Sequence, residues 1–230
     1  MTQGATRRLV VGFQDAVEDD PEVGEDGFFF DFAPDELHKA NISGATHERK
    51  DAVRNWQRIV DVGRRLVDDG VPLQLNDVAR LAKVGVATVY RHFPTPEALM
   101  ETVAAPGLEA LVAQAQKALA HDDSRQALAG FLNTTLEAQL TDPSITAVRS
   151  APDHVLPRTT ELTDAMDAHV GQLLGRAHAA GAVRGVVTWD DLRPLMCGIA
   201  YAAQVHADDL ETRLDSGRRY LGVMLHGMRA

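Results

Sequence analysis

The chain has 230 residues, of which 45% are apolar and 5% aromatic, and it carries a net charge of −10. This length allows one large domain or two small ones, and the single cysteine excludes an internal disulfide and fits a reducing cytosol. No apolar run approaches the roughly 18 residues that a membrane span requires, so we expect a soluble, cytoplasmic protein with no membrane partner. Cys197 lies in an apolar stretch, which favours a buried small side chain over a reactive thiol.

Residues 1–48 hold most of the negative charge, because they contain eleven Asp and Glu against three Lys and Arg. Such an acidic, turn-rich composition predicts a largely disordered N-terminal extension. The four Phe within residues 28–32 depart from that composition. We interpret them either as a segment that packs on the protein's own surface or as a partner-binding motif. An acidic arm that competes with nucleic acid and a wrongly assigned start site are further alternatives.

Between residues 47 and 69, apolar side chains recur at helical spacing and predict a helix with one buried stripe. The stripe comprises Trp56, Ile59, Val60, Gly63, Leu66 and Val67. Near the start of this helix, Lys50 and Arg54 oppose the helix dipole. Their position suggests a phosphate contact, although a solvated polar face explains them equally well. Gly70 and Pro72 are expected to end the helix.

Residues 74–93 predict two short helices joined by a tight turn at residues 83–85. The first begins at Gln74, a weak N-cap, or at Asn76. Its inward-facing residues are expected to be Val78, Ala79, Leu81 and Ala82. The second, from about residue 87 to residue 93, brings together Thr88, Tyr90, Arg91 and His92. A short helix so rich in hydrogen-bond donors can enter a DNA major groove. The alternative is an ordinary helical hairpin with a polar face.

Residues 94–119 predict a longer helix that contains a proline. Thr95 fits the N-cap, Pro96 suits the first helical position, and Glu97 is favoured at the positive end of the dipole. Pro106 removes one backbone hydrogen bond and predicts a kink. That kink either acts as a hinge or is simply tolerated.

Further helices are expected over residues 124–141, 143–151, 158–180, 189–206 and 209–229. No strand-like alternation is sustained, so the predicted fold class is all-α. Thr188 and Asp191 have the spacing of a capping box. The sequence contains no G-x-S-x-G, no Gly-rich phosphate loop and no H-E-x-x-H, and its nine His show no consistent metal-ligand spacing. We therefore expect no catalytic site, no metal and no cofactor.

The residues V-A-x-x-A from position 78 and T-V-Y-R-H-F-P-x-x-E-A-L from position 88 resemble the helix-turn-helix signature of the tetracycline-repressor (TetR) family. A looser resemblance continues to the C-terminus. It implies an N-terminal helix-turn-helix three-helix unit followed by a helical ligand-binding and dimerisation domain. We accordingly divide the chain into an extension (1–48), a DNA-binding domain (49–104) and an effector-binding and dimerisation domain (105–230).

This resemblance implies a ligand-responsive repressor that binds a palindromic double-stranded DNA operator as a homodimer. The residues expected to contact DNA are Lys50, Arg54, Lys83, Val86, Thr88, Tyr90, Arg91 and His92. The last two helices would pair with their copies in a second subunit as a four-helix bundle. Packing of these helices within one subunit is the alternative.

The resemblance also implies a pocket for an unknown small-molecule effector among the middle helices. The residues expected to line it are Phe131, Leu132, Met166 and His169, with Arg149, His154 and Trp189 as weaker candidates. Met166 and His169 share a helical face. His169 either lines the pocket or is a hydrogen-bonded residue of the core.

Two positions depart from the family pattern. Lys83 stands where Gly is usual, which predicts a strained or reshaped turn, and Pro96 replaces a Lys that resembles a phosphate contact. Residues 49–104 contain nine basic and seven acidic side chains, a weak positive charge for a DNA-binding domain. These features favour an alternative function, a TetR-like helical interaction protein that has lost sequence-specific DNA binding.

Overall fold

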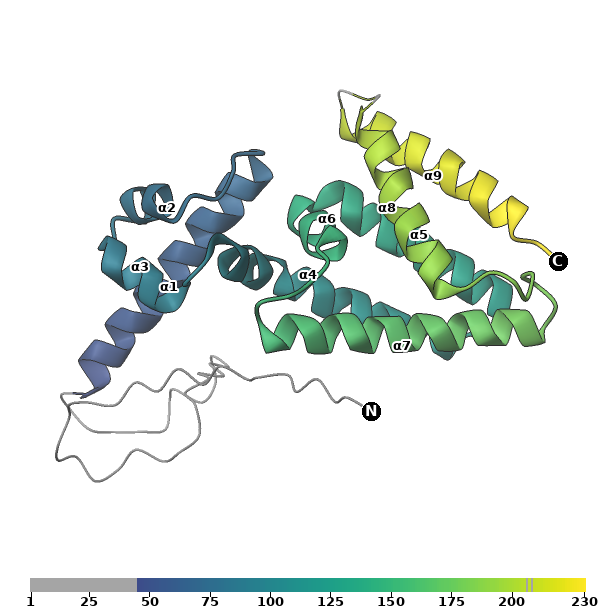
Figure 1. Cartoon of the computed structure of the whole chain (residues 1–230), viewed down its shortest axis with the longest axis horizontal. Coiled ribbons are helices and arrows are strands. Elements are labelled where there is room, and N and C mark those ends of the chain that lie inside the picture. Colours follow the sequence, from purple (N-terminus) through teal and green to yellow (C-terminus); the bar gives the residue numbers. More distant parts are fainter. Residues whose placement is uncertain (1–44, 206, 208) are drawn as a thin grey trace, which may run out of the picture. The chain divides into compact units, whose positions relative to one another are not determined.

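The computed structural model describes residues 45–205, 207 and 209–230, so the extension predicted over residues 1–48 lies almost entirely outside the described residues. Every regular element in the described part is an α-helix, which confirms the all-α fold class (Figure 1). None of these helices is long and apolar enough to cross a membrane.

The helices are α1 (Ala45–Asp68), α2 (Leu75–Ala82), α3 (Val86–His92), α4 (Pro96–Leu119), α5 (Ser124–Thr141), α6 (Pro143–Ser150), α7 (Pro157–Ala179), α8 (Trp189–Val205) and α9 (Leu210–Gly227). Their bounds agree with the sequence-based expectations to within two residues. The agreement follows from capping and breaking residues, whose effects are local in the chain.

Side-chain caps fix several of the helix starts. At the start of α4, Thr95 Oγ1 accepts the backbone N–H of Ala98 at 3.2 Å, and Pro96 takes the first helical position. At the start of α8, the predicted capping box is confirmed. The Asp191 carboxylate accepts the backbone N–H of Thr188 at 2.9 Å, and Thr188 Oγ1 accepts that of Asp191 at 3.3 Å.

Residues 49–104, here called the head, have a hydrophobic core of their own between α1, α2, α3 and the first part of α4. Ile59, Val78, Val89 and Leu99 are fully buried in it. Helices α1 and α4 approach closely at Gly63, where an added Cβ would lie 3.2 Å from the Leu99 side chain. This core therefore fixes α3 against the other three helices.

Two expectations for the head are wrong. Leu81 is 44% exposed, because the buried stripe of α2 runs through Leu75, Val78, Ala79 and Ala82 and leaves Leu81 off its axis. Trp56 is 37% exposed and meets the core only at its edge, with its ring centroid 6.4 Å from that of Phe93. Of the two starts expected for α2, the structure has the first, because the helix begins directly after Gln74, which makes no side-chain cap.

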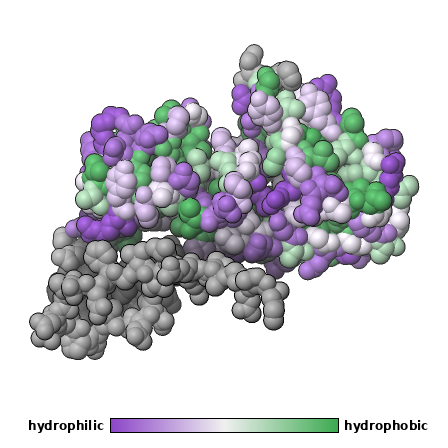
Figure 2. Space-filling view, in the orientation of Figure 1, coloured by the Kyte–Doolittle hydropathy of each residue, from purple (hydrophilic) through white to green (hydrophobic). Residues whose placement is uncertain are grey.

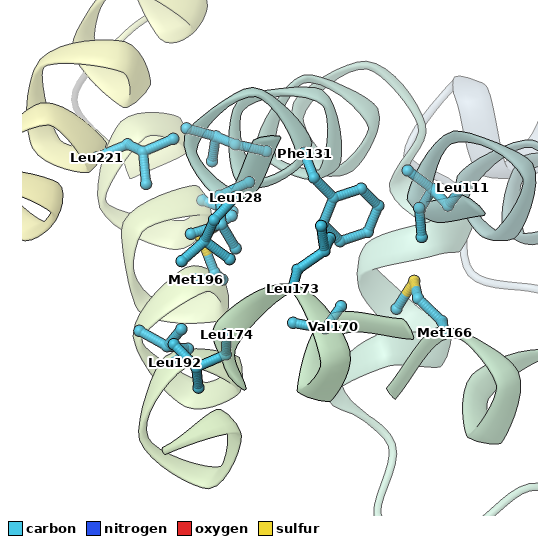
Figure 3. Packing of buried hydrophobic residues seen from close by; sticks show 14 of the residues in the cluster. Leu111, Leu128, Phe131, Met166, Val170, Leu173, Leu174, Leu192, Met196 and Leu221 are labelled. Atoms are coloured by element: carbon cyan, nitrogen blue, oxygen red, sulfur yellow. The ribbon is translucent and has the colours of Figure 1, made fainter. Parts of the chain in front are cut away.

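Residues 105–230, here called the body, enclose a second and larger core formed by α4 to α9. Figure 3 shows side chains from α5 and α7, among them Phe131, Val170 and Leu173, meeting in this core. Cys197 of α8 is half-buried, so the expected full burial is wrong. Its sulfur lies 3.8 Å from Gln139 Nε2, at the margin of the core.

Helix α4 contributes to both cores and continues without a break through Pro106. The next residue, Gly107, permits a close approach to α6, because an added Cβ there would lie 2.7 Å from Ile145 Cδ1. A single continuous helix therefore connects the head to the body.

Candidate nucleic-acid interface and ligand cavity

The turn between α2 and α3 is set by Lys83, which ends α2 in the left-handed region at φ 55° and ψ 43°. It is the one non-glycine residue with positive φ in the described part of the chain. The following N–H, that of Val84, donates to Ala79 O at 3.0 Å and closes the turn. A side chain in this conformation costs about 1–2 kcal/mol, so the strain predicted from the missing Gly is present.

Helix α3 buries one side and exposes the other. Val89 is fully buried, and Phe93, just after the helix, is 3% exposed. On the opposite side Val86, Tyr90 and Arg91 are exposed. Thr88 and His92, also expected to contact DNA, are half-buried at the margins of that side. The helix thus presents hydrogen-bond donors outward while its apolar side chains hold it in the head.

Some of the basic side chains around α3 form an ion pair and others do not. No ion pair with another described residue is seen for Lys50, Lys83 or Arg91, all of which are exposed. The Arg54 guanidinium lies 3.5 Å from the Asp51 carboxylate in an exposed ion pair. This pair makes Arg54 a weaker candidate for a phosphate contact than the unpaired side chains. Burial lowers the pKa of His92 below its usual 6.5, and the nearby Arg91 lowers it further. Both effects favour the neutral form of the His92 imidazole.

The body contains a cavity of about 310 Å³ at the loop between α6 and α7. Most of the side chains that line it are polar, and they come from α6, this loop, α7 and α8. The lining residues are Arg149, Ala151, Pro152, Asp153, His154, Thr160, Thr163, Asp164, Asp167 and Arg193. A smaller, apolar cavity of about 130 Å³ lies between α5 and α9.

Arg149 forms the buried wall of the larger cavity. Its side chain is 4% exposed, and both terminal nitrogens lie 3.3 Å from Asp167 Oδ1. Its guanidinium carbon lies 5.8 Å from the centre of the Trp189 ring, within range of a cation–π interaction. Burial lowers the pKa of Arg149, against the opposing effect of Asp167. The Trp189 Nε1 and His154 Nδ1 atoms are buried without a hydrogen-bond partner among the described residues.

The residues predicted to bind an effector fall into two groups. Phe131, Leu132 and Met166 are buried in the body core and line neither cavity. Arg149 lines the larger cavity, and Trp189 stacks beside it. A third position, His169, is half-buried with its Nδ1 lacking a partner among the described residues, and it lines neither cavity.

Sequence reasoning missed four charged residues of the larger cavity: Asp153, Asp164, Asp167 and Arg193. Asp164 and Asp167 are three residues apart on α7, a spacing that places both on one helical face. That spacing was a usable signal. No signal in the sequence pairs this face with Arg193 of α8, because the two helices are brought together only by the fold.

The wall of this cavity is tied to the head through Glu101, a buried residue of α4. The Glu101 carboxylate accepts the backbone N–H groups of Val155 and Leu156 at 2.8 and 2.9 Å. These residues directly follow Asp153 and His154, which line the cavity. The loop that encloses the cavity is therefore hydrogen-bonded to the helix that enters the head.

A second set of hydrogen bonds connects α6 to the head. Asp142 Oδ1 caps α6 by accepting the N–H of Ser144 at 2.9 Å, and it also accepts a 2.8 Å bond from Arg64 of α1. Arg64 donates in addition to the carbonyl of Val103 on α4. Both ends of α6 are thus connected to head residues, one through Arg64 and the other through the loop held by Glu101.

Helices α8 and α9 lie side by side (Figure 1). Both helices expose apolar side chains. Tyr201 is 69% exposed and Val223 74% exposed, with Leu195 and Val205 about half exposed. Elsewhere on the face drawn in Figure 2, hydrophobic residues are interspersed with hydrophilic ones. An exposed apolar surface on two neighbouring helices is suited to association with another molecule.

A family model described as the C-terminal domain of SbtR-like transcriptional regulators matches residues 123–230. A TetR transcription regulatory protein from Mycobacterium vanbaalenii is 27% identical, and the match covers 80% of this chain and 99% of that one at a TM-score of 0.45. None of the curated proteins matches the chain.

Two further solved structures share the fold. A TetR family transcription regulator from Shewanella sp. PV-4 is 16% identical over 76% of this chain and 98% of its own, at a TM-score of 0.57. The transcriptional regulator FadR from Bacillus subtilis, solved in complex with stearoyl-CoA, is 12% identical over 76% of this chain and all of its own, at a TM-score of 0.54. The arrangement of helices in the described part is therefore that of known transcriptional regulators.

Proposed function

We propose that the chain is a transcriptional regulator of the TetR family, and more specifically a cytoplasmic, ligand-responsive repressor that binds a palindromic operator as a homodimer. In this proposal residues 49–104 read DNA, while residues 105–230 bind the effector and form the dimer. The observation that carries it is the outward face of α3, where Tyr90 and Arg91 are exposed on a helix whose other side is fixed in a core.

This face suits the major groove of DNA. Exposed Arg91 can donate two hydrogen bonds to a guanine edge, whereas Thr88 and Tyr90 supply hydroxyls for bases or phosphates. Exposed Lys50 and Lys83 are available for phosphates, because neither is paired within the described residues. A positive, donor-rich surface of this kind supports sequence reading more than a merely structural role.

The dimer is supported by the exposed apolar faces of α8 and α9. Side chains such as Tyr201 and Val223 would be covered if these helices packed against their copies in a second subunit. Two heads are needed to read a palindrome, whose half-sites lie about 34–36 Å apart. A dimer therefore supplies both burial of the apolar surface and the symmetry of the operator.

The proposed response to a ligand is supported by the hydrogen bonds that Glu101 accepts from the loop after α6. A ligand in the larger cavity would shift the loop that carries Asp153 and His154, and the N–H groups of Val155 and Leu156 would move with it. Because Glu101 lies on α4, such a movement would act on the head. The ligand can shift the balance between two head positions only by its differential affinity for them, typically about 1–3 kcal/mol.

The proposal is tested by replacing Arg91. DNA fragments that bind the full-length protein are first selected from its genome, and affinities are then measured by fluorescence anisotropy. We expect Arg91→Ala to weaken binding to the selected DNA at least about tenfold, the loss of one good base contact, without unfolding the protein. Arg125→Ala, which removes an exposed charge at the start of α5, is the matched control. A loss below about threefold for Arg91→Ala would remove this residue from the interface.

A further inference from the structure

The larger cavity holds unpaired charges of both signs. Asp153 lines it from the loop, Asp164 from α7 and Arg193 from α8. Within the described residues, no hydrogen bond or ion pair is seen for any of these three side chains. Carboxylates and a guanidinium that face one cavity without neutralising each other leave room for a ligand that carries the complementary charges.

The buried wall of the cavity adds a second cation. Arg149 uses its two terminal nitrogens on a single oxygen of Asp167, at 3.3 Å in both cases. A guanidinium has five N–H donors in a planar fork, so this one-oxygen contact leaves most of its donor capacity unused. A buried charge that is compensated so weakly is costly unless a further partner approaches it. A carboxylate is the partner that matches the fork geometry.

We propose that this cavity binds a small zwitterion of the amino-acid class; the inference rests on the proposed ligand response and names its chemistry. The ligand's carboxylate would bind Arg149 and Arg193, and its ammonium group would bind Asp153 and Asp164. A cavity of about 310 Å³ is at the small end of the roughly 300–1,000 Å³ typical of ligand sites, so the ligand has few carbons. A simple anion would leave Asp153 and Asp164 unpaired, and a simple amine would leave Arg193 unpaired.

Calorimetric titration of the full-length protein, without DNA, tests this chemistry. Glycine, 4-aminobutyrate and 6-aminohexanoate are zwitterions with increasing distance between the two charges. Butyrate and butylamine are the matched controls for the middle one, since each keeps the carbon chain and removes one charge. We expect the best zwitterion to bind with a Kd at least about tenfold below that of either control. Equal binding by butylamine or butyrate, or no binding by any zwitterion, would overturn the proposal.

Variants locate the binding site. Arg193→Gln and Asp164→Asn each remove one unpaired charge from the cavity, and each should raise the Kd of the best zwitterion about tenfold or more. Asp122→Asn changes an exposed carboxylate between α4 and α5 and should leave the Kd unchanged. Wild-type affinity in both cavity variants would place the ligand elsewhere. Since these titrations contain no DNA, their failure is distinct from failure of the proposed function, which would appear as absent DNA selectivity.

Discussion

The head and the body place their functional residues along the chain in different ways. In the head, the outward-facing donors lie within the seven residues of α3. In the body, the larger cavity is assembled from α6, the loop after it, α7 and α8, which together span residues 149–193. Helical spacing determines which residues share a face of one helix, but only tertiary packing brings faces of different helices together. The two regions therefore differ in how far local sequence determines their function.

The largest expected effect on stability comes from Glu101, whose hydrogen bonds connect the head to the body. Glu101→Gln replaces a buried carboxylate that accepts two backbone N–H groups with a neutral amide. We expect the free energy of unfolding to fall by about 2 kcal/mol, because hydrogen bonds to a charged group are worth roughly 1.5–3 kcal/mol. Any effect of a ligand on DNA affinity should fall as well. Urea unfolding and anisotropy measure the two quantities.

Glu109→Gln is the matched control for this change. Glu109 pairs with Arg158 at 2.9 Å in an exposed position, where such a pair contributes only about 0–1 kcal/mol. If both variants lose the same small amount of stability, Glu101 does not hold the loop. The body would then affect the head by another route.

One substitution in the head is expected to change stability and DNA affinity in opposite directions. Lys83→Gly relieves the left-handed strain of the α2–α3 turn, so the free energy of unfolding should rise by about 0.5–1 kcal/mol. The same variant loses an exposed positive charge, so its DNA affinity should fall, most clearly at low salt. Lys83→Ala removes the charge and keeps the strain, which makes it the control. If the Lys83→Gly and Lys83→Ala variants are equally stable, the left-handed conformation of residue 83 does not strain the turn.

The smallest expected effect is a pH dependence that arises from His92. Its pKa is lowered in the folded head, first by burial and then by Arg91. The unfolded chain therefore binds a proton more readily, and folding stability should decrease as pH falls through 6.5 towards the lowered native pKa. His92→Gln should reduce this dependence in urea titrations at a series of pH values. An unchanged slope would show that other groups cause it.

The sequence predicts the helices well, because their bounds depend on local caps and breakers such as Thr95, Pro96 and the Thr188–Asp191 box. It also groups Thr88, Tyr90, Arg91 and His92 on α3, of which Tyr90 and Arg91 are exposed and the other two half-buried. Both results rest on interactions within a few residues of the chain.

The body cavity was only partly predictable. Apolar residues such as Phe131 and Met166 fit the pattern of a pocket lining, but the same pattern describes a core, and they are buried in one. Arg149 was expected to lie near a ligand and does line the cavity, whereas its neighbour Arg193 comes from a different helix, 44 residues later in the chain. Long-range packing of this kind leaves no periodic signal in one sequence.

The most direct test of the account compares full-length protein on a DNA fragment selected from its genome with a scrambled sequence of the same composition. Fluorescence anisotropy over a series of salt concentrations gives both affinities. We predict saturable binding that weakens as salt increases, with a preference for the selected fragment that persists at every salt concentration. Equal affinity for the two sequences throughout would contradict DNA reading by α3 and favour a helical interaction protein.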